Sequence, residues 1–330
     1  MKERVQYLDL LKAIAIFLVV FCHFVLLPGT IAANLLMCAC WMAVPTFFMV
    51  NGTLLFARPL NCRKHFTKTF SVYLVLVAWK MIYMLLIPLF SNTSALTADF
   101  GINSILNYLF LFGELPGIIN GHLWFIDALL AVYLVFPVLR IVYDYKDAHC
   151  APVGRRILWF LAAASLLCTN GLHSLEILGK MLQSIGIPFQ LSFDAISAFQ
   201  PFGKYGNMLG FFLLGALLGN PAEAEETESP SKHTRLFMDG PLQRILATVM
   251  LFTGVLTLWC VKWFLSGQPE WDGILLAEGY RHIPVILMAV GLFLLFRNVN
   301  QFKRPFYSFL HLFASRTLGI FYIHWLFGWM

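Results

Sequence analysis

The sequence predicts an all-α membrane protein, a polytopic bundle of about nine transmembrane helices whose N-terminus lies in the cytoplasm. Three observations support this prediction. Hydrophobic residues make up 59% of the 330 residues and charged residues only 12%, whereas soluble domains carry about 25% charged residues. Apolar segments long enough to cross a bilayer recur along the whole chain. Loops that contain lysine and arginine alternate along the chain with loops that contain few or none, as the positive-inside rule requires.

The apolar segments predict the individual spans, since a helix needs about 20 apolar residues to cross the hydrocarbon core. The first segment has no A-x-A cleavage site at its C-terminal end, where a signal peptidase would cut, and is interpreted as a retained span, not a signal peptide. We expect one transmembrane domain over residues 1–330, with a polar cytoplasmic linker at 220–241. The candidate spans are residues 8–28, 33–56, 70–90, 121–140, 157–172, 204–219, 242–264, 282–298 and 307–330.

The basic residues predict the orientation of these spans. The N-terminus and every second loop carry lysine or arginine, whereas the loops 91–120 and 173–203 contain none and one, respectively. Cytoplasmic loops hold the excess of basic residues. The N-terminus is therefore expected inside and the C-terminus outside. Proline and glycine in 173–203 indicate a re-entrant or interfacial helix.

The first span contains three ionisable side chains, Asp9, Lys12 and His23. Such groups are costly within a membrane and are candidates for a functional site. Lys12 and His23 are 11 residues apart, which places them on one helix face about 16 Å apart along the axis. Asp9 can pair with Lys12. Alternatively, Lys12 extends to the interface and His23 simply bonds to a carbonyl.

Three other spans also contain polar side chains. Asn51 and Gly52 lie in the second span and, taken alone, indicate close helix packing. The fourth span begins with His122 and Trp124 and continues to Asp127, which needs a partner within the membrane. The last span contains Arg316 and His324. Arg316 is expected at mid-depth, where it needs a counter-charge or a wet cavity.

Together these segments resemble the membrane acyltransferase-3 family of bacterial envelope O-acyltransferases. The family signature of a basic residue, ten others and a histidine matches Lys12 and His23, and its FFxxSG segment appears with Asn51 in place of serine. Its HLWF segment matches His122 to Phe125, followed by Tyr133 and Pro137, and its GIYLIH segment matches Gly319 to His324.

The sequence also departs from the family pattern. It has no RxxR cluster before the third span and no SGNH domain, two features that members of the family carry. It looks shortened at the C-terminus, because the family has about ten spans.

The resemblance implies an enzyme that transfers an acyl group, by default acetyl, from cytoplasmic acyl-CoA (acetyl-CoA) to a hydroxyl of an envelope glycan or lipid-linked sugar. It also implies a multi-pass protein of the bacterial inner membrane, in contact with membrane lipids. No metal is expected.

The resemblance also implies roles for individual residues. His23 is the expected general base, because the pKa of an imidazole lies near neutrality. Lys12, at the mouth of a polar channel, would act together with Arg63, Lys64 and Lys68 in binding the coenzyme phosphates. Asn51 would donate a hydrogen bond to the developing oxyanion. The residues expected to line the acceptor site are His122, Trp124, Asp127, Arg316 and His324.

Two other classes of protein have similar intramembrane residues. One is a proton-coupled transporter or flippase of an envelope precursor, and the other is a sensor or partner subunit without chemistry. The absence of an internal repeat and the order of the motifs favour the enzyme. Consumption of acetyl-CoA by the purified protein would separate the classes, because transport does not consume a thioester.

Overall fold

The computed structural model confirms the all-α fold class, since helices are the regular secondary structure throughout the described residues and none of these residues is in a strand. The structure describes residues 5–24, 30–90, 101–111, 113, 121–147, 152–188, 205–219, 240–266, 279–297, 299 and 302–327. The helices are α1 (Gln6–Phe24), α2 (Ile31–Cys40), α3 (Ala43–Phe56), α4 (Cys62–Phe90), α5 (Ile102–Phe110), α6 (Trp124–Asp144), α7 (Val153–Leu166), α8 (Leu172–Ser184), α10 (Gly206–Leu218), α11 (Pro241–Ser266), α13 (Ile283–Phe296) and α14 (Arg304–Phe327).

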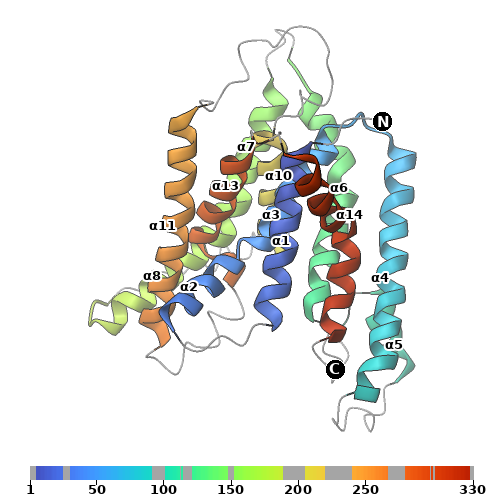
Figure 1. Ribbon diagram of the computed structural model, residues 1–330, viewed down its shortest axis with the longest axis horizontal. Helices are drawn as coiled ribbons and strands as arrows, with labels where there is room; N and C mark the ends of the chain where they lie inside the picture. The colour runs from blue at the N-terminus through green and yellow to red at the C-terminus, as the bar shows by residue number, and fades with distance from the viewer. Residues whose placement is uncertain are drawn as a thin grey trace. The chain divides into compact units, whose positions relative to one another are not determined.

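The chain divides into two compact units. The first comprises Met1–Arg58 and Ile141–Ser315, and the second comprises Pro59–Arg140 and Arg316–Met330. In the first unit, α10 packs against α3 and α7, and α11 packs along α13 (Figure 1). The second unit contains α4, α5, most of α6 and the C-terminal half of α14.

Six helical stretches have the length and apolar composition needed to cross a membrane. They are Gln6–Phe24, Ile31–Phe56, Cys62–Leu86, Gly121–Asp144, Val153–Ser184 and Pro241–Phe264. The helices α10 and α13 are apolar but shorter, and α14 covers the ninth candidate span. Each of the nine predicted segments therefore contains helix, whereas the number of spans and the location of the N-terminus remain predictions.

Three predicted boundaries differ from the structure. The fifth span does not end at 172, because a π-helical turn, Leu167–Gly171, connects α7 to α8 and the helical stretch continues to Ser184. The wider π-turn accommodates an extra residue without ending the helix. The segment 91–120 contains the helix α5 and is not only a loop. Of the predicted linker at 220–241, residues 220–239 lie outside the described residues. The helix α11 begins at Pro241, the last residue of the predicted linker.

Glycines bring α3 and α10 into backbone contact in the first unit. A Cβ atom on Gly52 would overlap the carbonyl oxygen of Phe212, and one on Gly215 would overlap that of Met49. The Thr53 hydroxyl donates a hydrogen bond to the Gly215 carbonyl at 2.7 Å. Small residues permit this close approach between membrane helices, so the FFMVNG segment forms a helix-packing surface.

Asp9 connects α1 to the start of α14, also within the first unit. The carboxylate is 5% exposed. Its Oδ2 accepts a hydrogen bond of 3.2 Å from the Tyr307 hydroxyl and lies 3.5 Å from His311 Nδ1. The sequence suggested Lys12 as the partner of Asp9, and the structure adds these two partners from a helix almost 300 residues away.

The orientation of the helices can be tested by labelling. The alternation of basic and basic-poor loops predicts that residue 228 lies in the cytoplasm. A cysteine introduced there in a cysteine-free variant should therefore be protected from a membrane-impermeant maleimide in intact cells and react after permeabilisation. A cysteine at 275, in the predicted outer loop 265–281, should react without permeabilisation. Strong labelling at 228 in intact cells would reverse the predicted orientation.

Candidate functional site

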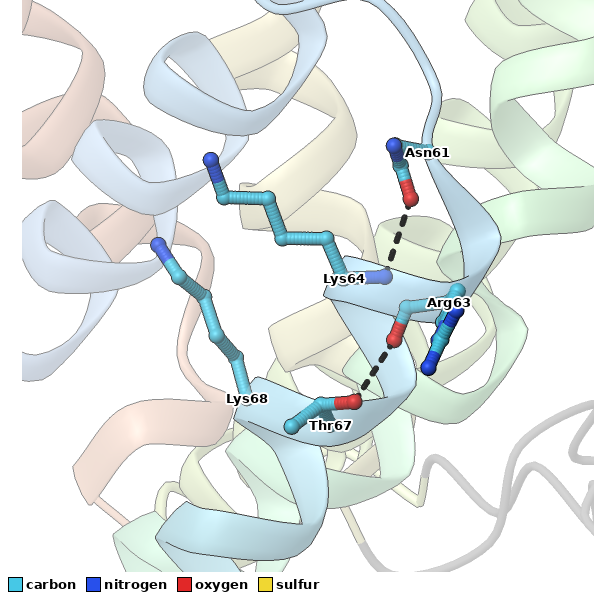
Figure 2. A pocket seen from close by; sticks show the side chains of 5 residues that line it. All are labelled: Asn61, Arg63, Lys64, Thr67 and Lys68. Carbon is cyan, nitrogen blue, oxygen red and sulfur yellow. Dashed lines mark hydrogen bonds between the residues drawn. The ribbon is translucent and has the colours of Figure 1, made fainter.

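A cationic pocket lies at the start of α4, in the second unit. It has a volume of about 540 Å³ and is lined by Asn61, Arg63, Lys64, Thr67 and Lys68 (Figure 2). The Lys64 and Lys68 side chains extend to the same side of the helix, one turn apart, and Arg63 points in another direction. The three basic residues that the sequence proposed for phosphate binding are thus brought together by one short helical segment.

The local sequence explains why the helix begins here. Asn61 Oδ1 accepts a hydrogen bond of 2.9 Å from the backbone N–H of Lys64, the bond of an N-cap residue. The first turn of α4 contains no acidic residue. Its N-terminal end carries the positive end of the helix dipole, which adds to the three side-chain charges. This combination suits an anion such as a phosphate.

His65 anchors this turn of the helix. Its side chain is 9% exposed, and Nε2 lies 2.8 Å from the carbonyl oxygen of Tyr133 on α6. Because a carbonyl only accepts, Nε2 carries the proton. The ring also packs against Phe136, with centroids 4.9 Å apart. The basic side chains therefore project from a turn that α6 holds in place.

A second group of polar side chains is buried deeper in the second unit, around His122 and His324. These two side chains are 6% and 3% exposed, and their rings lie 5.2 Å apart in a T-shaped arrangement. Trp325 stacks on the His122 ring at 5.4 Å. Both histidines were candidates for the acceptor site, and the structure places them side by side although 202 residues separate them.

The hydrogen bonds define the tautomers of both rings. The single proton of the Tyr83 hydroxyl is donated to the Tyr322 carbonyl at 2.7 Å. The 3.3 Å contact between Tyr83 and His122 therefore requires His122 Nε2 to donate, which leaves Nδ1 as an acceptor in the neutral ring. His324 Nδ1 donates to the Phe321 carbonyl at 2.7 Å, so its Nε2 is an acceptor.

Lys80 is a buried cation that the sequence analysis missed. It is 3% exposed, donates to the Tyr108 carbonyl at 3.1 Å and lies over the Tyr108 ring. It lies within electrostatic range of Asp127, the residue for which the sequence required an intramembrane partner. A lysine in the middle of an apolar span is itself costly, and this signal could have identified Lys80.

Asp127 and Tyr322 lie in the same region of the second unit. The Oδ1 atom of Asp127 and the hydroxyl of Tyr322 are both buried and make no hydrogen bond within the part of the chain that the structure describes. The neutral Tyr322 hydroxyl lies within electrostatic range of the Asp127 carboxyl. Buried polar groups in native proteins usually have a partner, so these two atoms point to a ligand or a bound water.

The other candidate residues occupy different environments. Lys12 and His23 lie on the unbroken helix α1, so the spacing of three turns is confirmed. Lys12 is half-buried, and His23 is exposed in the last turn. Asn51 donates to the carbonyl of Phe47 in its own helix at 2.8 Å. Trp124, half-buried, begins α6, and Arg316 is exposed on α14.

The first unit contains a polar clamp that sequence reasoning also missed. The side-chain amide of Asn170, in the π-turn, donates to the carbonyls of Tyr280 and His282 at 2.9 and 3.0 Å. Asn207 donates to the same Tyr280 carbonyl at 3.0 Å. These bonds hold the turn that precedes α13 and place the His282 ring 4.9 Å from that of His173. The asparagine amides thus donate to the carbonyls at the N-terminal edge of α13, one of which, that of His282, also accepts from the backbone N–H of Val285.

Comparison with known proteins gives one match. A sequence model of the family described as an acyltransferase domain matches residues 5–330, which is essentially the whole chain. No curated protein and no solved structure matches the chain.

Proposed function

Because this chain belongs to the acyltransferase-3 family and is an acyltransferase, we propose that it transfers an acyl group, by default acetyl, from cytoplasmic acyl-CoA to a hydroxyl of an envelope glycan or lipid-linked sugar. The apolar helices agree with a multi-pass membrane protein, for which we propose the bacterial inner membrane. Family membership favours this chemistry over the transport and sensor alternatives.

The observation that carries the proposal is the pocket at the start of α4. Coenzyme A carries several phosphate groups at one end and its thioester at the other. Arg63, Lys64 and Lys68 surround a pocket at a helix N-terminus, and arginine and lysine together supply both fork-shaped and point-charge contacts to phosphate. The basic loops are proposed to face the cytoplasm, where the donor is found.

The helix α4 also connects this pocket with the buried polar group in the same unit. Lys80 and Tyr83 follow Lys68 by 12 and 15 residues, or about 18 and 22 Å along the helix axis. A coenzyme whose phosphates bind at the first turn can extend its pantetheine arm along α4. The residues of the second unit that we propose for the acceptor side of the reaction are His122, Trp124, Asp127, Arg316 and His324.

His23 is the proposed general base. It removes the proton from the acceptor hydroxyl while that oxygen attacks the thioester carbonyl, Asn51 donates to the oxyanion, and the C–S bond then breaks. The thiolate of coenzyme A leaves and takes up the proton from His23. A covalent relay through an acyl-His23 intermediate is the alternative. We prefer the general-base role of His23 to the covalent relay, because direct transfer needs one acyl-transfer step instead of two.

The donor site can be tested by replacing Arg63, Lys64 and Lys68 together with alanine. Losing three phosphate-binding cations should raise the KM for acetyl-CoA by about tenfold or more, with little change in the KM for the acceptor. The measurement is release of coenzyme A by the purified protein, with octyl β-D-glucoside as a trial acceptor and membrane extract as a second one.

The matched control is the double variant Lys303→Ala with Arg304→Ala. It removes two exposed basic residues from another loop that is expected in the cytoplasm, and it should leave the KM for acetyl-CoA unchanged. If the triple variant inserts with the correct orientation and binds acetyl-CoA as well as the wild type, the three residues only help to orient the chain.

A further inference from the structure

We propose that His65 is a positioning residue for the cationic pocket at the start of α4, and that Pro137 in α6 prepares the backbone carbonyl on which His65 acts. The inference rests on the proposed function in one respect, since the ligand of the pocket is taken to be the phosphate end of the acyl donor. The pocket and both residues belong to the second unit, so the contact lies within one compact part of the chain.

Pro137 changes the hydrogen bonding of the Tyr133 carbonyl. In an α-helix the carbonyl of one residue accepts from the N–H four residues later, and Tyr133 and Pro137 have this spacing inside α6. Proline has no N–H, and its ring crowds the carbonyl four residues before it. Pro137 therefore cannot donate to Tyr133. In membrane helices such a carbonyl is commonly bonded by a donor from a neighbouring helix.

His65 is a donor of this kind. Its Nε2 lies 2.8 Å from the Tyr133 carbonyl oxygen, and its ring packs against the rings of Tyr133 and Phe136 with centroids 5.8 and 4.9 Å apart. A single side chain of α4 thus contacts a carbonyl and two aromatic rings from one turn of α6. These contacts fix both the depth and the direction of the imidazole.

The contact holds the part of α4 that carries the basic side chains. Residues 61–70 are exposed apart from His65 and Thr69. The Thr69 hydroxyl donates to the His65 carbonyl at 3.0 Å, a bond within α4 itself. The hydrogen bond of His65 instead crosses to α6 from the turn on which Lys64 and Lys68 extend to one side (Figure 2).

Phosphate binding depends on where this turn lies. Charge-assisted hydrogen bonds between ammonium and phosphate require N···O distances of about 2.7–2.9 Å, and every lining residue of the pocket comes from residues 61–68. His65 does not line the pocket. It acts through its neighbours in the helix, by keeping their side chains and the helix N-terminus in position for one anion.

Calorimetry on the full-length protein in nanodiscs tests this role without acyl transfer, with coenzyme A and inorganic pyrophosphate as probes. His65→Leu removes the donor and should weaken both probes about fivefold, the effect expected from one hydrogen bond. His65→Gln should bind within about twofold of the wild type, because the glutamine amide can donate from near the position of Nε2. With acetyl-CoA as substrate, His65→Leu should raise KM and leave kcat unchanged.

A double-mutant cycle joins His65 to Pro137. Pro137→Ala provides an N–H that competes for the Tyr133 carbonyl, and it should weaken both probes about threefold by itself. Added to His65→Leu, it should cause no further loss, because the bond between the two helices is already absent. Losses that multiply would instead show two independent effects on the helices.

Thr69→Val is the matched control. It removes the hydroxyl of the other buried residue in this part of α4, and the bond that is lost lies within the helix. Its affinities for both probes should equal those of the wild type. The melting temperature of each variant is measured in parallel. If His65→Leu does not fold, His65→Asn replaces it in the cycle, because the shorter asparagine amide does not reach the position of Nε2.

The outcomes separate the positioning role from the proposed function. Losses that multiply overturn the role, as does wild-type affinity in His65→Leu or an equal loss in His65→Gln. Failure of the wild type to bind either probe also overturns it. If pyrophosphate binding follows the cycle but the protein does not consume acetyl-CoA, the positioning role holds and the proposed donor fails. Consumption of acetyl-CoA together with multiplied losses gives the opposite result.

Discussion

His23→Gln is expected to lower the rate of acyl transfer by about 10²–10⁴-fold, the usual contribution of a general base. Glutamine preserves much of the size and hydrogen bonding of histidine but cannot take up a proton at neutral pH. His23→Ala should therefore be only slightly less active than His23→Gln. The exposed position of His23 in the last turn of α1 predicts that both variants accumulate as folded protein. The measurement is single-turnover transfer from labelled acetyl-CoA, alongside the elution profile of the purified variant.

A neighbouring residue provides the control for this prediction. Cys22 precedes His23, and its thiol bonds to the Val19 carbonyl of its own helix at 3.1 Å. Cys22→Ala changes the same turn without removing a base and should keep the wild-type rate. If His23→Gln retains most of the wild-type rate, the base assignment is wrong and His23 is a residue of the helix surface.

Gly215→Leu is expected to prevent the accumulation of folded protein, and Gly215→Ala to lower the melting temperature clearly. A side chain at this position overlaps the Met49 carbonyl oxygen, and α3 and α10 would have to separate along their glycine contacts. Overpacking of this kind costs about 1–3 kcal/mol or more, and here the Thr53 hydrogen bond to the Gly215 carbonyl would also be strained. Thermal unfolding in detergent, followed by size-exclusion chromatography, measures the effect.

Gly319→Ala is the matched control, because Gly319 also lies inside a helix and inside one of the family motifs. Apart from its chain neighbours and the backbone of its own helix, no atom of the described residues lies within 4 Å of a Cβ placed there, and alanine favours helix over glycine by about 1 kcal/mol. Its melting temperature should be unchanged or slightly higher. Equal loss of stability in Gly215→Ala and Gly319→Ala would show that the contact between α3 and α10 has no special role.

The sequence predicted the site unevenly, and the reasons are physical. Positions on a single helix could be related from their spacing, so Lys12 and His23 were correctly placed on one helix, and Arg63, Lys64 and Lys68 were correctly grouped. The acyltransferase family was likewise confirmed. The catalytic and binding roles of these residues remain predictions, because their test is kinetic.

Composition and periodicity by themselves determined the helical fold class and the approximate position of each helix, because the bilayer demands long apolar segments with internally satisfied backbones. Only the tertiary structure decided which polar side chains meet. His122 lies against His324, and Lys80 comes within electrostatic range of Asp127, 47 residues further on. No local spacing encodes either proximity. The π-turn at Leu167–Gly171 likewise depends on tertiary contacts, since Asn170 in it bonds to carbonyls 110 and 112 residues away. Helix packing thus determines the chemistry of the buried polar group, because it brings together side chains that are far apart in the sequence.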